Sequence, residues 1–180
     1  MRRFILVLVA GILSACGSVP ATGGGGGETP QPTQSPVALT CTSAGTASTN
    51  WPKAWEAGAK PAITKVEATG DVLTLTFVTG TPEFTVVQQP NAKFEQDASG
   101  RPVVLTGSAG VRIVLRGFRG DLSNYEGPDK LSSTGPLLLQ AGSIGDFEGV
   151  VSFGAGVSAP ACANVTATGS TLTFHFITAH

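Results

Sequence analysis

Two acidic side chains, Asp146 and Glu148, stand two residues apart in the segment Gly145-Asp146-Phe147-Glu148-Gly149. Two carboxyl groups are the minimum that glycoside hydrolysis requires. On a strand that began early enough, both side chains would share one face, about 7 Å apart at a rise of about 3.3 Å per residue. The segment is also typical of a turn that leads into a strand, with the aspartate bonded to its own backbone. We expect a structural role, with ligand contact and hydrolysis as the alternatives.

Three arginines, Arg112, Arg116 and Arg119, form a local cationic grouping. A guanidinium group binds a carboxylate through two parallel hydrogen bonds, and both muramic-type glycans and stem peptides carry carboxylates. An arginine row of this kind on a β-face is more often a solvated surface, or pairs with Asp and Glu across strands; the alternative, which makes these arginines candidate binding residues, is that they contact a ligand. Tyr125, the single tyrosine, either stacks on a sugar or a partner or anchors its loop.

The sequence has two histidines, His175 and His180, and no HExxH, GxSxG or CxxC pattern. Zinc sites and Ser-His-Asp sites place histidines together with carboxylates or other ligands. We therefore expect a protein that is not an enzyme and that uses no metal and no cofactor.

The N-terminus reads as an export signal. Arg2 and Arg3 precede an apolar run over 4–13 and then Leu13-Ser14-Ala15-Cys16, which is the order of a signal peptide. The run of ten residues is too short for a spanning helix, which takes about 20. The last four residues resemble the bacterial lipobox, whose cysteine receives a diacylglycerol before the signal peptide is cleaved. We predict a signal peptide over 1–15 and lipid, including palmitate, on Cys16; the alternative is a secretory signal with an incidental cysteine.

Residues 16–36 are rich in Gly and Pro and hold almost no apolar side chain, which is typical of an unstructured tether. Residues 37–180 have the length of one domain. Without Arg2 and Arg3, nine Lys and Arg stand against twelve Asp and Glu, a formal charge of −3. This sign excludes an electrostatic nucleic-acid binder. We predict an exported protein that is anchored to a bacterial membrane and faces away from the cytoplasm.

Lipid on Cys16 would leave Cys41 and Cys162 as a pair. Disulfides persist in oxidising compartments outside the cytoplasm, so we predict a Cys41–Cys162 bridge. The alternative is two free thiols.

The sequence pattern of residues 37–180 predicts β-strands. Apolar residues alternate with polar ones in several short runs, and Gly, Pro, Asn and Asp separate the runs, as in half-buried antiparallel strands. We predict an all-β fold, an antiparallel β-sandwich or a partly open barrel of about eight or nine short strands. The predicted strands are 63–68, 72–78, 83–88, 103–106, 111–115, 137–141, 147–153, 165–167 and 171–177. Residues 51–57 form either a short helix or a loop, and 117–136 is the least regular part.

The order of several segments resembles the AMIN-like domain of secreted and lipid-anchored bacterial proteins over about 65–180. The segments are Val72-Leu-Thr-Leu-Thr-Phe77, Pro82-Glu-Phe-Thr-Val86, Gly100-Arg-Pro-Val-Val104, Val111-Arg-Ile-Val-Leu115, Gly145-Asp-Phe-Glu-Gly149 and a hydrophobic C-terminal strand. The resemblance implies a β-sandwich that localises envelope proteins by contacting peptidoglycan or neighbouring envelope components. No amidase, protease or secretin domain accompanies it in this sequence.

Together these observations favour a lipid-anchored, non-catalytic module that binds a cell-envelope component, with peptidoglycan or another glycan ahead of a protein. The alternative is an accessory or structural module that docks an envelope protein partner, and a carboxylate-based hydrolase is the third candidate.

Overall fold

The computed structural model describes residues 42–46, 63–118 and 127–179, which belong to the compact unit Val37–His180. All regular structure in these residues is β-strand. The strands are β1 Thr42–Gly45, β2 Ile63–Thr69, β3 Val72–Phe77, β4 Glu83–Gln89, β5 Lys93–Glu95, β6 Pro102–Val104, β7 Ala109–Arg116, β8 Lys130–Ser132, β9 Leu138–Phe147, β10 Val150–Val157, β11 Ala161–Thr168 and β12 Thr171–Thr178.

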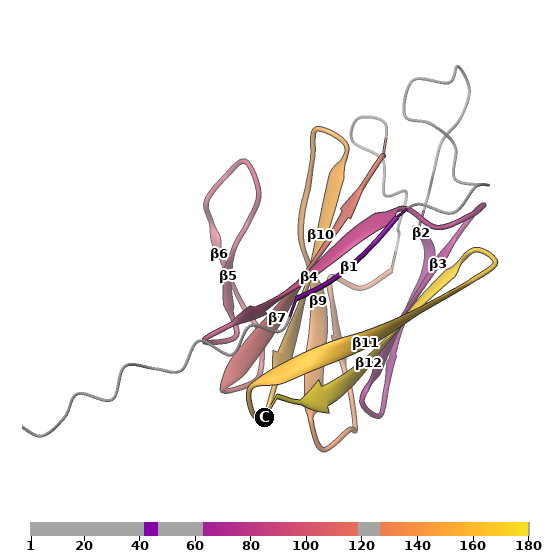
Figure 1. Cartoon of the computed structure of the whole chain (residues 1–180). Helices are drawn as coiled ribbons and strands as arrows, with labels where there is room; N and C mark the ends of the chain where they lie inside the picture. Colours follow the sequence, from indigo (N-terminus) through magenta and orange to yellow (C-terminus); the bar gives the residue numbers. More distant parts are fainter. Residues whose placement is uncertain (1–41, 47–62, 119–126, 180) are drawn as a thin grey trace, which may run out of the picture. The chain divides into compact units, whose positions relative to one another are not determined.

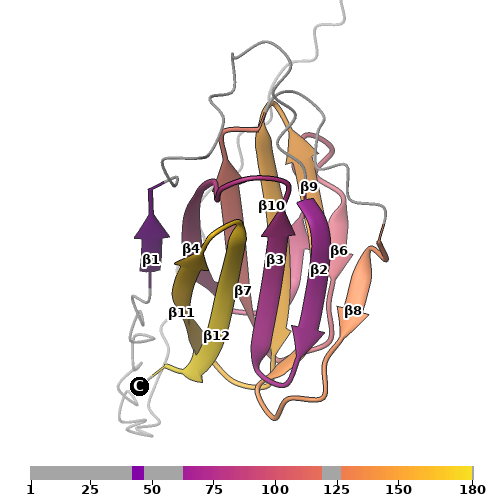
Figure 2. The same cartoon turned by 90° about the vertical axis from the view of Figure 1, so that its right-hand side faces the viewer.

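Two antiparallel sheets face each other. The larger has six strands in the order β1-β4-β7-β10-β9-β8, and the smaller has four in the order β11-β12-β3-β2. Figure 2 looks onto the smaller sheet, with the larger sheet behind it. In the described part of the chain both sheets have free edges, so the structure is a sandwich and not a closed barrel. The predicted all-β sandwich is confirmed.

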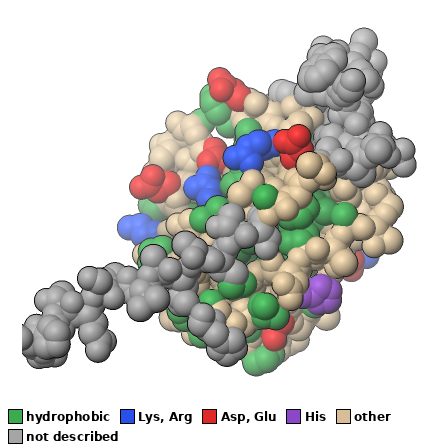
Figure 3. Space-filling model, in the orientation of Figure 1, with side chains coloured by type: hydrophobic (Ala, Val, Ile, Leu, Met, Phe, Trp, Pro, Cys, Tyr) green, Lys and Arg blue, Asp and Glu red, His purple; other side chains and the backbone are tan. Residues whose placement is uncertain are grey.

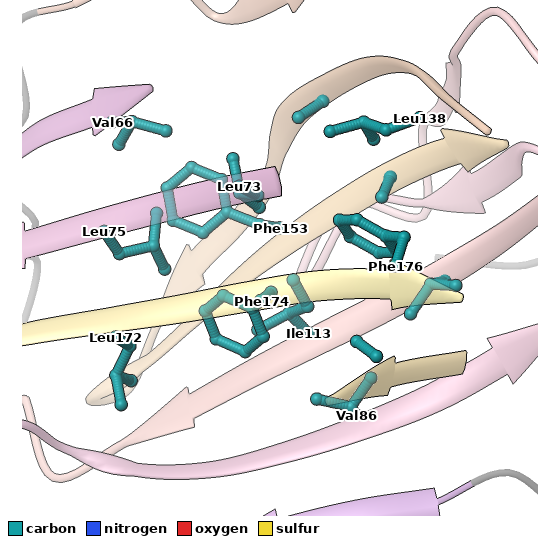
Figure 4. Packing of buried hydrophobic residues seen from close by; sticks show 14 of the residues in the cluster. Val66, Leu73, Leu75, Val86, Ile113, Leu138, Phe153, Leu172, Phe174 and Phe176 are labelled. Carbon is teal, nitrogen blue, oxygen red and sulfur yellow. The ribbon is translucent and has the colours of Figure 1, made fainter. Parts of the chain in front are cut away.

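The core lies between the two sheets and follows the period of two along each strand. On β3 and β12, apolar side chains alternate with half-buried or exposed polar ones, and Leu73, Leu75 and Phe174 are fully buried. Ile113 and Phe153 of the larger sheet pack against them from the opposite side (Figure 4). The alternation read from the sequence therefore fixes which face of each strand is inside.

A third layer covers part of the larger sheet. The hairpin β5–β6 lies on the outer face of this sheet, on the side away from β11 and β12 (Figure 1). A small apolar cluster between the hairpin and the sheet consists of Ala92, Phe94, Leu105 and Ile144, with Val103 packed against it. The outer face therefore has a half that the hairpin covers and a half that it leaves open.

Glycines make the close approach of the hairpin possible. A Cβ atom at Gly154 would lie 2.8 Å from Cε2 of Phe94, and one at Gly156 would overlap the backbone oxygen of Thr106. Side chains on this part of β10 would therefore hold the hairpin away from the sheet. We call the positions under the hairpin the covered half: Gly110 and Arg112 on β7, Gly154 and Gly156 on β10, and Gly142 and Gly145 on β9.

A β-bulge interrupts β9. Ser152 pairs with Gly145 and Phe153 pairs with Ser143, so Ile144 is an extra residue without a partner on β10. A bulge of this kind lets two successive residues point to the same side of the sheet. Ile144 accordingly joins the cluster under the hairpin and is fully buried there.

The structure corrects several boundaries. The predicted strand 147–153 is wrong, because a turn at Glu148 and Gly149 separates β9 from β10. The sequence pattern did not reveal β1, β5 and β8, since strands of three or four residues are too short to show a period. The structure thus has more strands than predicted. The predicted helix or loop at 51–57 lies outside the described residues.

Candidate ligand-binding face

The two acidic residues lie at the tip of the β9–β10 hairpin. Asp146 is the penultimate residue of β9 and pairs with Val151, whereas Glu148 is in the turn itself. Glu148 and Gly149 have φ values of 50° and 79°, and two successive positive φ values define the tight turn that suits a two-residue hairpin loop. The alternative in which Asp146 and Glu148 share a strand face is wrong, and the predicted turn is confirmed.

Arg112 lies in the covered half, where a carboxylate of the hairpin loop binds its guanidinium group. Its Nη2 atom forms an ion pair with Oδ1 of Asp97, from the loop that joins β5 to β6. The two side chains are only 27% and 23% exposed. The backbone nitrogen of Asp97 also donates to the carbonyl oxygen of Ile144 at 3.3 Å. Arg112 therefore serves to hold the hairpin loop on the sheet.

Arg116 lies four residues further along β7, on the same face but beyond the hairpin. It is exposed, and its Nη1 atom donates to Oγ1 of Thr85 at 3.0 Å. Among the described residues no carboxylate forms an ion pair with it, since these residues contain only the pairs Lys65–Glu67 and Arg112–Asp97. The structure thus separates the two arginines that the sequence grouped.

The strand register places further side chains in one row with Arg116. Glu83 of β4 is paired with Arg116, Arg116 with Val150 of β10, and Val150 with Phe147 of β9. Directly paired residues point to the same side of a sheet. Phe147 is 47% exposed. We call the row Glu83, Arg116, Val150 and Phe147, together with Thr85, the open half.

Two buried polar atoms mark the boundary between the two halves. Oγ of Ser152 and Oδ2 of Asp97 have no hydrogen-bond partner among the described residues. Ser152 is paired with Gly145, and the Asp97 carboxylate lies where a side chain at Gly145 would be. Both atoms therefore lie over the same part of the β9–β10 pair, at the edge of the hairpin loop.

The remaining predicted site residues give no common site. Arg119, Tyr125, Cys16 and Cys41 lie outside the described residues. Cys162 of β11 is half-buried, and its disulfide bond with Cys41 stays a prediction. No cluster of three or more His, Cys, Asp or Glu side chains that could hold a metal ion occurs in the described part of the chain. The same part contains no helix with the length and apolarity needed to cross a membrane.

Sequence reasoning did not identify Asp97, Thr85 or Phe147 as part of this face. Asp97 and Thr85 come from segments distant from β7 in the sequence, so nothing local pointed to their meeting with the arginines. Phe147 carried a signal, because an aromatic residue directly before a Glu-Gly turn is at the end of a strand. Figure 3 shows charged side chains of both signs interspersed on the upper part of the face that it draws.

Comparison with protein families matches residues 42–171 to the AMIN-like domain. The match covers well over half of the chain, so the protein belongs to the AMIN-like domain family. Membership indicates a bacterial cell-envelope protein and a binding module related to peptidoglycan. Searches of curated proteins and of solved structures gave no match.

Proposed function

We propose that this protein is a lipid-anchored, non-catalytic module that binds peptidoglycan or another envelope glycan. The observation that carries the proposal is the AMIN-like match over 42–171, joined to the lipobox that ends at Cys16. Lipid chains on Cys16 would hold the protein at a bacterial membrane. The tether over 16–36 would let the sandwich reach envelope material away from the lipid surface.

The position of the carboxylates supports a non-catalytic role. The two carboxyl groups of a glycosidase flank the scissile bond from opposite sides. Asp146 and Glu148 are instead both exposed at one hairpin tip, and Glu148 lies in the turn itself, with a φ of 50°. We expect Glu148→Gln to leave every envelope phenotype unchanged, and a loss of glycan cleavage in this variant would instead establish a hydrolase.

Retention on purified sacculi tests the proposed binding. The protein without residues 1–15 and with Cys16→Ser would be mixed with sacculi and sedimented, with sacculus-free tubes as the control. We expect a saturable bound fraction. If none sediments, the alternative of an accessory module that docks an envelope protein replaces the glycan-binding function.

Fractionation of the producing cells tests the anchor. The unmodified protein should sediment with membranes and incorporate labelled palmitate, and Cys16→Ser should abolish both. Serine keeps the size and polarity of the position but offers no thiol for the lipid. Unchanged membrane retention and labelling in the variant would exclude Cys16 as the attachment point.

A further inference from the structure

We propose that the open half is a binding surface for a sugar that carries one carboxylate, with Phe147 stacked on the sugar ring and Arg116 bound to the carboxylate. The inference rests on the proposed glycan-binding function and assigns it to particular side chains. It also predicts which glycans bind, because the two groups require different parts of the ligand.

The spacing of the two groups suits a disaccharide. Arg116 on β7 and Phe147 on β9 are two strands apart in one row, with Val150 of β10 between them. Neighbouring strands are about 4.8 Å apart, so the two backbone positions are separated by about 10 Å. Since Val150 presents only a short apolar side chain, the row forms a low platform on which an extended ligand contacts both ends.

Phe147 provides the apolar contact. Its side chain is one of the four large hydrophobic side chains that the described residues expose, together with Val78, Val104 and Ile177. It is the only aromatic one among them. The face of an aromatic ring carries partial negative charge, which attracts the weakly positive C–H groups on the face of a sugar ring. A stacked sugar would also remove the exposed ring from water.

Arg116 provides the charge. A guanidinium group has five N–H donors, and the hydrogen bond to Oγ1 of Thr85 uses Nη1 and orients the group. The other donors have no partner among the described residues, whereas the guanidinium of Arg112 already has the Asp97 carboxylate. Arg116 is therefore the arginine of β7 whose guanidinium group can bind the carboxylate of a ligand.

Glu83 restricts the ligand class. It is paired with Arg116 across β4 and β7 and is exposed, so the row has one positive and one negative group. A polyphosphate would be repelled by Glu83, but a monocarboxylate would bind Arg116 while a sugar hydroxyl donates to Glu83. This combination matches a glycan unit that carries free hydroxyl groups and one acidic substituent.

Titration with two disaccharides tests the surface. The protein without residues 1–15 and with Cys16→Ser would be observed by amide NMR during addition of GlcNAc–MurNAc, which has one carboxylate, or of GlcNAc–GlcNAc, which has none. We expect shifts to concentrate at 83–85, 114–116 and 147–150, with tighter binding of the acidic disaccharide. Shifts concentrated elsewhere, or equal affinities, would overturn the proposal.

Matched variants separate the two contributions. Arg116→Gln should weaken the acidic disaccharide about tenfold, the size expected for one charge-assisted hydrogen bond, and leave the neutral one unchanged. Phe147→Ala should weaken both. Arg101→Gln and Ile177→Ala remove an exposed arginine and an exposed apolar side chain elsewhere and should change neither. If all four variants bind both disaccharides as the unsubstituted protein does, the proposed binding surface is wrong.

Sacculus retention by the same variants distinguishes failure of this surface from failure of the proposed function. Sacculus retention that Arg116→Gln and Phe147→Ala do not reduce would keep the proposed function and overturn this surface. Disaccharide binding at the row without sacculus retention would support the surface and overturn intact peptidoglycan as its target.

Discussion

The covered and open halves of the larger sheet share the same strands but have opposite surroundings. Arg112 and Arg116 are four residues apart on one face of β7, yet the first is bound by a carboxylate of the same chain and the second is exposed. The covered half is built from glycines on β9 and β10, and the open half presents Val150 and Phe147 instead. Side-chain size along two strands thus decides where the hairpin can lie and which arginine stays accessible.

The contrast between the two arginines shows that residue type and spacing do not by themselves define a binding residue. Both arginines fit the expectation of a carboxylate ligand, and Arg112 does bind one, but the carboxylate is Asp97 of the same chain. An internal acidic partner thus leaves one arginine with a structural role. Three experiments test how far the two halves are independent.

The largest effect is expected from Phe94→Ala. Phe94 is 3% exposed and contributes the largest side chain of the cluster under the hairpin. We expect a loss of about 3 kcal/mol in the free energy of unfolding, as for other buried phenylalanines, measured by urea denaturation. Amide exchange should accelerate in 92–105 and stay slow in β3 and β12. Uniform acceleration throughout the sandwich would show that the two clusters form one cooperative unit.

A smaller loss is expected from Gly156→Ala. The added methyl group overlaps the backbone oxygen of Thr106, which cannot rotate away as a side chain would, so the base of the hairpin must shift. Overpacking of this kind costs about 2 kcal/mol. Thr85→Ala in the open half is the control and should change stability by less than about 0.5 kcal/mol. An unchanged free energy of unfolding in Gly156→Ala would show that the hairpin is not packed tightly against β10.

The smallest effect distinguishes the two arginines. Arg112→Ala leaves the largely buried Asp97 carboxylate without its partner, and we expect a loss of about 1 kcal/mol, since the pair is still partly exposed. Arg116→Ala should cost less than about 0.5 kcal/mol. Urea denaturation of both variants in parallel provides the measurement. Equal losses would contradict the separation of the two halves.

The sequence predicted the sandwich because its core strands alternate cleanly. In β3, β7 and β12 the apolar and polar positions match the buried and exposed faces. Prediction failed where glycine replaced the polar positions, as in Gly154-Ala155-Gly156 of β10, since glycines under a hairpin resemble those of a turn. The run from Phe147 to Phe153 also alternates in appearance, which concealed the turn at Glu148 and Gly149.

The candidate face was less predictable than the fold. Arg112 and Arg116 could be placed on one face of a strand from their spacing alone. What the spacing could not reveal was the hairpin β5–β6, whose three-residue strands carry no periodic signal and whose loop brings Asp97 to Arg112. Contacts between distant segments depend on packing that short local patterns do not encode.

The bulge at Ile144 determines on which face of the sheet each later side chain of β9 lies. Side chains alternate along a strand, so one inserted residue exchanges the two faces from that point onward. With Ile144 unpaired, Phe147 shares the outer side with Val150 and Arg116. If Ile144 were instead paired with Ser152 in a regular ladder, the same ring would point into the sandwich and Asp146 would lie opposite Val150. A deletion of Ile144 would leave Gly145 directly after Ser143, with both keeping their present partners, and Phe147 would stay outside. The bulge thus adds one buried side chain to the cluster under the hairpin without changing the chemistry of the hairpin tip.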